Sequence, residues 1–217
     1  MISADAIVEL VAAADSSPFL FNHYAQAIPG VDLPSAPQIR RENLAKYLSA
    51  HQLIGSSELW VLEAPSKRGA LRTGVPLTSE SKLVELSKKL GVSPPFARAT
   101  NGAADFAAVS QTSQAVWEAI GDGKMPVLWN AIMLRPHTGD LTHTRNPSRD
   151  ELRKHAPILV TLVDWLKPKS IVWVGRKAER IADYAKLVGK TVRHPANGGK
   201  SDFLHGILTI QRANSRA

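Results

Sequence analysis

The chain has 217 residues and carries 27 Lys and Arg side chains against 19 Asp and Glu, a formal net charge of +8 at neutral pH. Hydrophobic residues make up 44% and charged residues 21%, which excludes a disordered chain and predicts one globular domain over residues 1–217. Because the chain has no cysteine, disulfides, zinc–thiolate sites, iron–sulfur clusters and thiol nucleophiles are also excluded.

Amphipathic segments alternate with irregular ones along the chain. Residues 15–37 contain four prolines and are predicted to form an irregular arm. Ser148 and Glu151 have the spacing of a capping box, which predicts that a helix begins there and runs to about Leu166, with a kink at Pro157. Helical spacing of apolar residues predicts further helices at residues 2–14, 38–53, 80–90, 110–121, 176–187 and 200–212.

Short apolar runs lie between these helices and predict strands at residues 58–62, 126–132, 170–174 and 191–193. Buried strands that alternate with helices are typical of an α/β fold with a parallel sheet covered on both faces. Ligands of such folds bind at the carboxyl ends of the strands. In this sequence the residues at those ends are Glu63, Asn130, Gly175 and His194.

The basic residues are concentrated in the second part of the chain. Residues 133–217 hold 16 basic and 7 acidic side chains, a net charge of +9, whereas residues 1–132 have a net charge of −1. Such a bias favours a polyanionic partner such as DNA, because phosphate contacts release counterions. A solvated basic face without a partner is the alternative.

Other functional classes lack support in the sequence. No phosphate-binding or dinucleotide-binding glycine motif is present, and no Gly-x-Ser-x-Gly nucleophile motif occurs. His137 and His143 share a loop, but no carboxylate lies at metal-ligand spacing. No apolar run reaches 18 residues, and the first residues lack the pattern of a secretory signal. We therefore expect no metal, cofactor or membrane partner, and a cytoplasmic protein.

Three segments, each predicted to run from a strand end into a polar loop, carry the most specific signal. The first is Trp60-Val61-Leu62-Glu63-Ala64-Pro65-Ser66, with its continuation Arg72-Thr73-Gly74-Val75-Pro76-Leu77-Thr78-Ser79-Glu80. The second is Leu128-Trp129-Asn130-Ala131, with its continuation to Arg135-Pro136-His137, and the third is Arg193-His194-Pro195-Ala196-Asn197-Gly198-Gly199-Lys200. In this order and at these separations they resemble the uracil-DNA glycosylase superfamily, and most of all its bacterial branch without an iron–sulfur cluster. The resemblance extends over most of the chain, from Phe21 to about Gly206.

The resemblance implies a three-layer α/β/α sandwich around a four-stranded parallel sheet. It also implies a monofunctional DNA repair enzyme that flips uracil out of DNA and hydrolyses the N-glycosidic bond, leaving an abasic site. By this resemblance His194 donates a hydrogen bond to uracil O2, and Asn130 recognises the O4 and N3–H edge. The alternatives are a structural loop histidine and an asparagine that caps a strand end.

The motif leaves two candidates for the residue that activates water. The most familiar members of the superfamily place an aspartate where this chain has Ala64. Glu63 precedes that position, and Glu80 lies where another branch keeps an acid. Either carboxylate could orient water, and Glu63 is preferred because it lies at a strand end. Either could instead be structural, since Glu80 could cap the following helix.

The remaining expected contacts also follow from the resemblance. Ala64, Pro65 and Leu77 are expected to line the base pocket with Asn130, although many relatives have a phenylalanine in place of Leu77. Residues expected to approach DNA are Arg72, Thr73, Gly74, Asn197, Gly198, Gly199 and Lys200.

Two other functions remain open from the sequence. Ala64 and Leu77 favour a catalytically weak protein that binds uracil-containing or abasic DNA. A glycosylase for another deaminated base, hypoxanthine or xanthine, is the third possibility. For each of these functions a monomer is expected.

Overall fold

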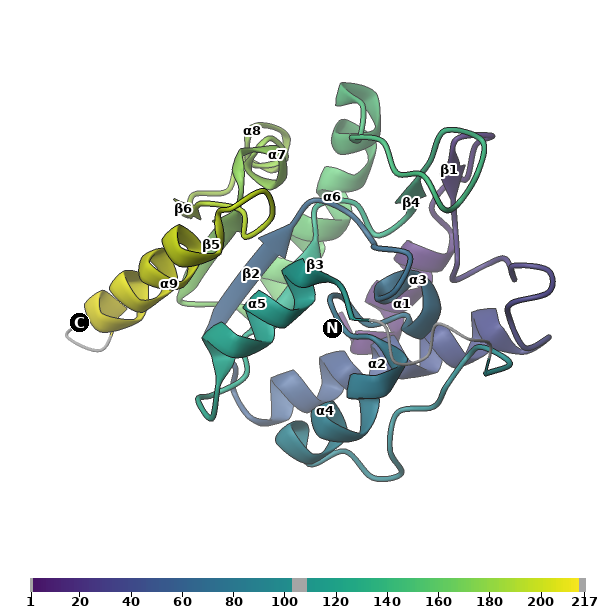
Figure 1. The fold of residues 1–217 in the computed structure, drawn as a ribbon, viewed down its shortest axis with the longest axis horizontal. Helices are drawn as coiled ribbons and strands as arrows, with labels where there is room; N and C mark the ends of the chain where they lie inside the picture. The colour runs from purple at the N-terminus through teal and green to yellow at the C-terminus, as the bar shows by residue number, and fades with distance from the viewer. Residues whose placement is uncertain (1, 103–108, 215–217) are drawn as a thin grey trace.

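The computed structural model describes residues 2–102 and 109–214, and a four-stranded parallel sheet lies at its centre. The strand order is β3 (Val127–Asn130), β2 (Glu58–Leu62), β5 (Ser170–Val174) and β6 (Lys190–Val192). Every pairing in this sheet is parallel, so the carboxyl ends of all the strands meet at one edge (Figure 1). The predicted strands and their parallel arrangement are confirmed.

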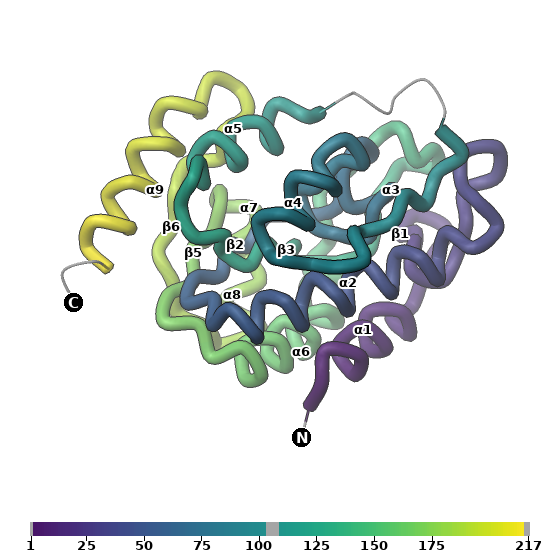
Figure 2. Tube along the Cα trace, turned by 90° about the horizontal axis from the view of Figure 1, so that it is seen from below, coloured from purple at the N-terminus to yellow at the C-terminus, as the bar shows by residue number. Residues whose placement is uncertain are grey.

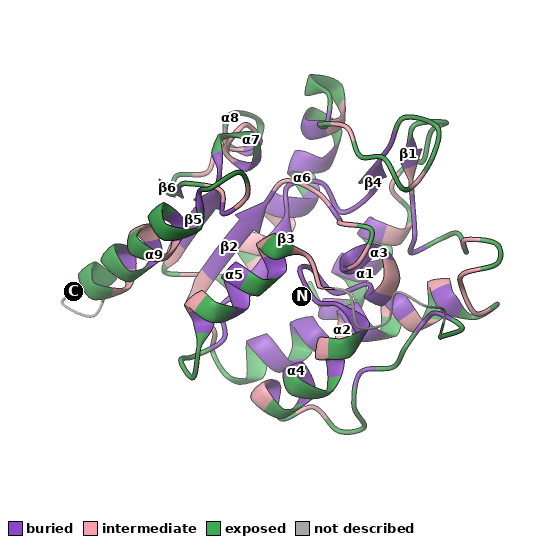
Figure 3. Cartoon of the chain, in the orientation of Figure 1, coloured by how far each residue is buried: buried purple, intermediate pink, exposed green. Residues whose placement is uncertain are grey.

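Helices cover both faces of the sheet and make the three-layer α/β/α sandwich that was expected. On one face lie α5 (Gln111–Ile120) and α9 (Lys200–Asn214), and on the other lie α6 (Arg149–Leu166) and α8 (Ala182–Ala185) (Figures 1 and 2). Strands β2, β3 and β5 are buried almost throughout, which explains their unbroken apolar runs, whereas the edge strand β6 is mostly exposed (Figure 3). Trp60 of β2 meets Phe203 of α9 edge to face, with ring centroids 6.3 Å apart.

Helix α2 (Ala36–Leu53) contacts the edge strand β3 through Tyr47. The Tyr47 hydroxyl accepts a hydrogen bond from the Leu128 N–H at 2.6 Å and lies 3.3 Å from the Leu128 carbonyl oxygen, to which it donates. The edge strand therefore finds hydrogen-bond partners in a side chain of the helix instead of another strand.

Helix α1 (Ala4–Ala12) packs on α2 and is held at its end by Asn22. The Asn22 amide donates to the carbonyls of Val11, Ala12 and Ala14 at the carboxyl end of this helix. This contact ties the segment after α1 to the body of the protein.

The capping box at the start of α6 is present as predicted. The Ser148 hydroxyl accepts from the Glu151 N–H at 3.1 Å, and the Glu151 carboxylate accepts from the Ser148 N–H at 2.7 Å. The helix continues through Pro157 to Leu166. The other predicted helical segments correspond to η1 (Glu80–Lys82), α4 (Leu83–Leu90), α7 (Arg176–Glu179) and the helices already named.

Two parts of the chain differ from the prediction. The arm at residues 15–37 contains β1 (Leu20–Phe21), which pairs antiparallel with β4 (Arg135–Pro136) from the loop after β3. The loop at residues 64–79 contains the short helix α3 (Ala70–Thr73). Elements of two to four residues are too short to show periodicity, and the ribbon joins segments more than one hundred residues apart.

In the described ranges, no helix is both long enough and apolar enough to cross a membrane.

Candidate functional site

Polar residues gather where the strands of the sheet end. Asn130 is the last residue of β3, Glu63 follows β2, Gly175 follows β5, and His194 lies two residues beyond β6. The strand order places Glu63 between Asn130 and Gly175. Beyond the sheet, the Ala131 N–H donates to the Leu62 carbonyl at 2.6 Å, so the loops after β2 and β3 leave the sheet side by side.

Gly175 allows His194 to lie against the end of β5. The backbone of Gly175 has a φ of +91°, and a Cβ added there would be 2.9 Å from the Cβ of His194. A side chain at this position would therefore push the histidine away. With no side chain on Gly175, His194 lies over the end of the strand next to β2, the strand that Glu63 follows.

The His194 imidazole is held as a neutral hydrogen-bond donor. Its Nδ1 accepts from the Ala196 N–H at 3.1 Å, which leaves the proton on Nε2. Burial lowers the pKa of His194, and the charges of Lys177 and Arg193 lower it further. At neutral pH this ring therefore presents an N–H from Nε2.

Asn130 is a buried amide whose polar atoms find no partner in the described parts of the chain. The residue is 1% exposed, and neither Oδ1 nor Nδ2 makes a hydrogen bond there. A buried polar group left unpaired costs about 1–3 kcal/mol. The amide thus keeps one acceptor and two donors for a ligand, at the expense of stability.

Glu63 keeps a carboxylate oxygen without a hydrogen bond among the described residues. Its Oε1 is buried. Burial raises the pKa of Glu63, while the positive charges of Lys177 and Arg180 oppose that rise. Lys177 acts on both Glu63 and His194, so these two side chains lie in one electrostatic environment.

Glu80 is instead engaged by the protein itself. Its Oε1 accepts from the N–H groups of Ala99 at 3.1 Å and Thr100 at 3.0 Å, and its Oε2 accepts from the Thr100 hydroxyl at 2.6 Å. The Arg98 Nε lies 3.5 Å from the same carboxylate. These contacts anchor residues 98–100 to η1 and favour the structural alternative for Glu80.

The segment Arg72-Thr73-Gly74 lies mostly inside the protein. The Thr73 hydroxyl accepts from the Val75 N–H at 3.1 Å and donates to the Thr78 carbonyl at 2.8 Å. A Cβ on Gly74 would be 2.5 Å from the Arg40 carbonyl oxygen, so a glycine is needed for packing on α2. Thr73 and Gly74 are both buried and do not fit the predicted contact with DNA, whereas Arg72 is half-buried and donates from Nε to the Lys67 carbonyl at 3.1 Å.

The expected base-pocket residues lie along the loop that follows β2. Ala64 is half-buried, and the carbonyl of buried Pro65 accepts from the Arg135 Nη1 at 2.7 Å. Leu77 is 6% exposed and has a φ of +55°, which costs a non-glycine residue about 1–2 kcal/mol. Its carbonyl accepts from the Ser113 hydroxyl at 2.6 Å and the Trp117 Nε1 at 3.3 Å. Two donors from α5 thus hold a strained backbone in place.

The loop after His194 turns sharply into α9. Asn197 and Gly198 are exposed and have φ values of +53° and +77°. Gly199 is buried, and a Cβ there would be 2.2 Å from the His194 carbonyl oxygen. Lys200 is exposed and forms an ion pair with Glu118 at 2.7 Å, so a phosphate would compete with that carboxylate.

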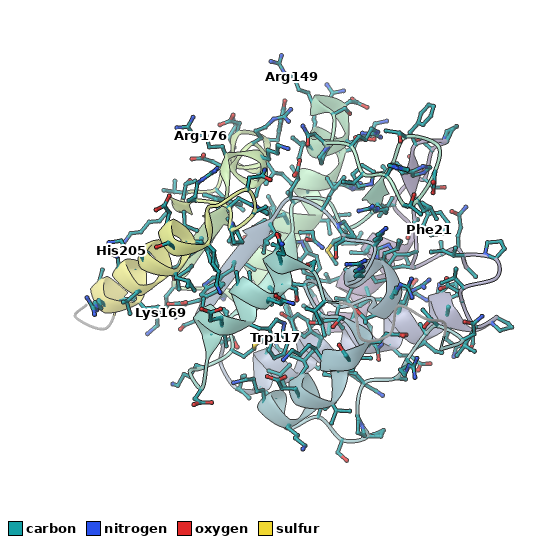
Figure 4. The ribbon with its side chains drawn as sticks, viewed as in Figure 1. Phe21, Trp117, Arg149, Lys169, Arg176 and His205 are labelled. Carbon is teal, nitrogen blue, oxygen red and sulfur yellow. The ribbon has the colours of Figure 1, made fainter. Side chains whose placement is uncertain are left out.

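Basic side chains border this edge of the molecule. Arg149 at the start of α6 and Arg176 at the start of α7 both project outward near the ends of the strands (Figure 4). Within residues 2–102 and 109–214, no three His, Asp or Glu side chains are grouped as metal ligands.

Two buried arginines, to which the sequence assigned no role, are structural parts of the site. Arg40 forms a fully buried ion pair with Asp32 at 2.6 Å and also donates to the carbonyls of His23 and Arg72. Arg135 is 4% exposed and joins Pro65 to the loop at Leu141. Arg40 lies in a helical pattern where charges usually face solvent, so only its burial distinguishes it.

Comparison with known proteins adds to this geometry. No protein-family model and no curated protein matches the chain. Thirty solved chains match, among them wild-type SMUG2 from Pedobacter heparinus, with 12% sequence identity, a TM-score of 0.58 and full coverage of both chains. The chain therefore shares its fold with that protein over its whole length.

Proposed function

We propose that the protein is a DNA glycosylase that flips uracil out of DNA and hydrolyses its N-glycosidic bond, leaving an abasic site. The observation that carries this proposal is the buried amide of Asn130, which has no partner among the described residues and lies at the strand ends with Glu63 and His194. The likeness to SMUG2, a member of the uracil-DNA glycosylase superfamily, supports it. The three sequence segments also support it, because each lies at the carboxyl end of one strand of this sheet.

Asn130 accounts for the choice of base. Its Nδ2 donates to uracil O4, and its Oδ1 accepts from uracil N3–H. Cytosine carries an amino group in place of O4 and has no proton on N3, so it presents the opposite pattern to a fixed amide. The burial of Asn130 makes such a mismatch costly, because the amide would again be left unpaired.

His194 and Glu63 account for the chemistry. When the C1′–N1 bond breaks, its electron pair leaves with uracil, and the His194 Nε2–H stabilises the negative charge on O2. Water adds its oxygen to C1′ of the cationic sugar, and its proton passes to the Glu63 carboxylate. We assign this role to Glu63 over Glu80, because both oxygens of Glu80 already accept hydrogen bonds.

The loop after His194 accounts for the contact with DNA. Gly198 offers a backbone N–H group, Lys200 offers a charge, and exposed Asn197 enters the gap left by the flipped base. The N–H of buried Gly199 instead donates to the Ala196 carbonyl at 3.1 Å, which does not fit the predicted contact with DNA. The basic residues along this edge provide the salt-dependent part of binding.

Ala64 and Leu77 support a second candidate, a protein that binds uracil-containing or abasic DNA with little turnover. Ala64 carries no carboxylate, and Leu77 stacks less well on a base than an aromatic ring. The third possibility, excision of hypoxanthine or xanthine, uses the same oxo-base recognition and is distinguished only by the substrate.

The test is cleavage of end-labelled duplexes that contain U·G, U·A or hypoxanthine·T, with excess protein, EDTA and alkali to cut abasic sites. We expect cleavage at uracil in EDTA. Cleavage confined to hypoxanthine would establish the third possibility. No cleavage of any base, together with a retained mobility shift on uracil or abasic DNA, would establish the binding protein and overturn the proposed reaction.

A further inference from the structure

His23 is a buried histidine that has no role in the proposed reaction. It is fully buried, and neither of its ring nitrogens has a hydrogen-bond partner in the described parts of the chain. Its ring lies on that of Tyr24, with centroids 4.2 Å apart. Burial holds the pKa of His23 well below its usual value, and Arg40 and Arg135 lower it further, so the ring is neutral.

The backbone around His23 is fixed against the loop that follows β2. The Arg40 Nη1 donates to the His23 carbonyl at 3.2 Å, and the Arg40 Nε donates to the Arg72 carbonyl at 3.1 Å. On the same side, the Tyr24 hydroxyl donates to the Gly74 carbonyl at 2.7 Å. His23 is therefore tied through two neighbouring contacts to the second half of that loop.

The segment just before His23 pairs with β4. Phe21 pairs with Arg135 in the β1–β4 ribbon, and Arg135 bonds to the Pro65 carbonyl, two residues after Glu63. The charge of Arg135 acts on the His23 ring. His23 thus lies where the ribbon, the loop after β2 and the loop after Asn130 come together.

Unpaired polar atoms are concentrated in these joined segments. Besides both nitrogens of His23, the Arg135 Nε and the Asn130 amide are buried without a partner among the described residues. Each such group destabilises the fold, and a polar ligand that pairs with them recovers that loss. Arg135 supplies only a donor, whereas neutral His23 and Asn130 each supply both a donor and an acceptor.

We propose that His23 is a specificity-determining residue that hydrogen-bonds the flipped base together with Asn130. This inference rests on the proposed function and deepens it. Because the unpaired groups hold more donors than acceptors, the ligand they suit is a base with carbonyl oxygens and a ring N–H. Uracil, hypoxanthine and xanthine have this pattern, and cytosine does not.

The test compares His23→Phe with His23→Asn. Phenylalanine keeps the ring on Tyr24 but has no nitrogen, whereas asparagine keeps a donor and an acceptor. Excision of uracil by His23→Phe should fall roughly 10–100-fold, with a changed ratio of uracil to hypoxanthine excision, and His23→Asn should recover most of the loss. An unchanged rate of excision by His23→Phe would overturn the proposal. So would a loss that is equal for every base and is not recovered by His23→Asn.

His51→Phe is the matched control. His51 is also buried, and its Nε2 has no partner in the described ranges. Its Nδ1, however, bonds to Ser56 just before β2, at the amino ends of the strands and away from the site. This variant should lose stability and leave the ratio of bases excised unchanged. The control separates a general cost of burying the new ring from a role in recognition.

A binding measurement keeps the proposal testable if wild-type protein cleaves nothing. A duplex with 2′-fluoro-deoxyuridine resists cleavage, because the fluorine destabilises the cationic sugar. In NMR spectra of protein with ¹⁵N-labelled histidine, binding of this duplex should shift the ring nitrogen resonances of His23 and leave those of His51 unchanged. Binding without a shift at His23 would overturn the role of His23, whatever the outcome for the reaction.

Discussion

Replacing Gly175 with alanine should disable the site through His194 alone. The added Cβ would be 2.9 Å from the His194 Cβ, while ordinary contacts begin at 3.4 Å. Relief of this contact requires a displacement of about 0.5–1 Å, and a shift of that size in a catalytic group costs roughly 100-fold in rate. The backbone of Gly175, at φ +91° and ψ 149°, lies in a region that is essentially restricted to glycine, which adds about 1–3 kcal/mol of strain.

Single-turnover excision from a saturating U·G duplex measures the rate effect, and urea unfolding measures the strain. Gly91→Ala is the matched control, because Gly91 also has a positive φ, +64°, but a Cβ there would meet nothing within 4 Å. Because Gly91 lies in the ordinary left-handed region, the control should lose less stability than Gly175→Ala and keep its rate. In a His194→Ala background, Gly175→Ala should cause little further loss of rate.

Two results would refute this reasoning. A wild-type rate for Gly175→Ala would mean that His194 does not depend on the close approach to β5. An equal loss of rate with and without the His194 side chain would mean that Gly175 acts by another route.

Three further predictions concern single residues of the site and the core. Asn130→Leu should stabilise the protein by about 1 kcal/mol in urea unfolding and abolish excision, because it removes unpaired polar atoms; a destabilised variant would contradict this. Glu63→Gln should slow single-turnover excision and remove an acidic limb of the pH–rate profile, since the carboxylate must lose its proton above its raised pKa. Glu80→Gln should instead lower stability by about 1.5–3 kcal/mol with little change in the rate of folded protein, and a reversed pair of outcomes would exchange the two roles. Burial lowers the pKa of His155 to about 4, so its protonation favours the unfolded chain, and stability should fall by about 2 kcal/mol between pH 7 and pH 5. Urea unfolding of His155→Leu should lose that part of the pH dependence, and an unaltered slope would assign it elsewhere.

The sequence predicted the parts of the fold whose signals are local. The strands at residues 58–62 and 170–174 match the structure at both ends, because buried parallel strands read as short apolar runs. The capping box correctly marked the start of α6, because its two side chains lie only three residues apart and the signal is local. Once the strands are parallel, the convergence of the residues that follow them is a consequence of topology.

The parts that the sequence did not reveal depend on contacts between distant segments. Glu80 is engaged by residues 98–100, and nothing in the motif around Glu80 indicates those donors. The contact between Gly175 and His194 and the isolation of the Asn130 amide likewise exist only once the strands are side by side. The ribbon of β1 and β4, which brings His23 to the site, pairs only two residues of each segment.

The most direct test of the account is to identify what the protein releases from a U·G duplex in EDTA. Mass spectrometry of the small molecules should detect free uracil with wild-type protein and none with Asn130→Leu, while the duplex keeps an abasic site. No free base from the wild-type protein, or equal release from both proteins, would contradict the claim that the edge at Asn130, Glu63 and His194 excises uracil.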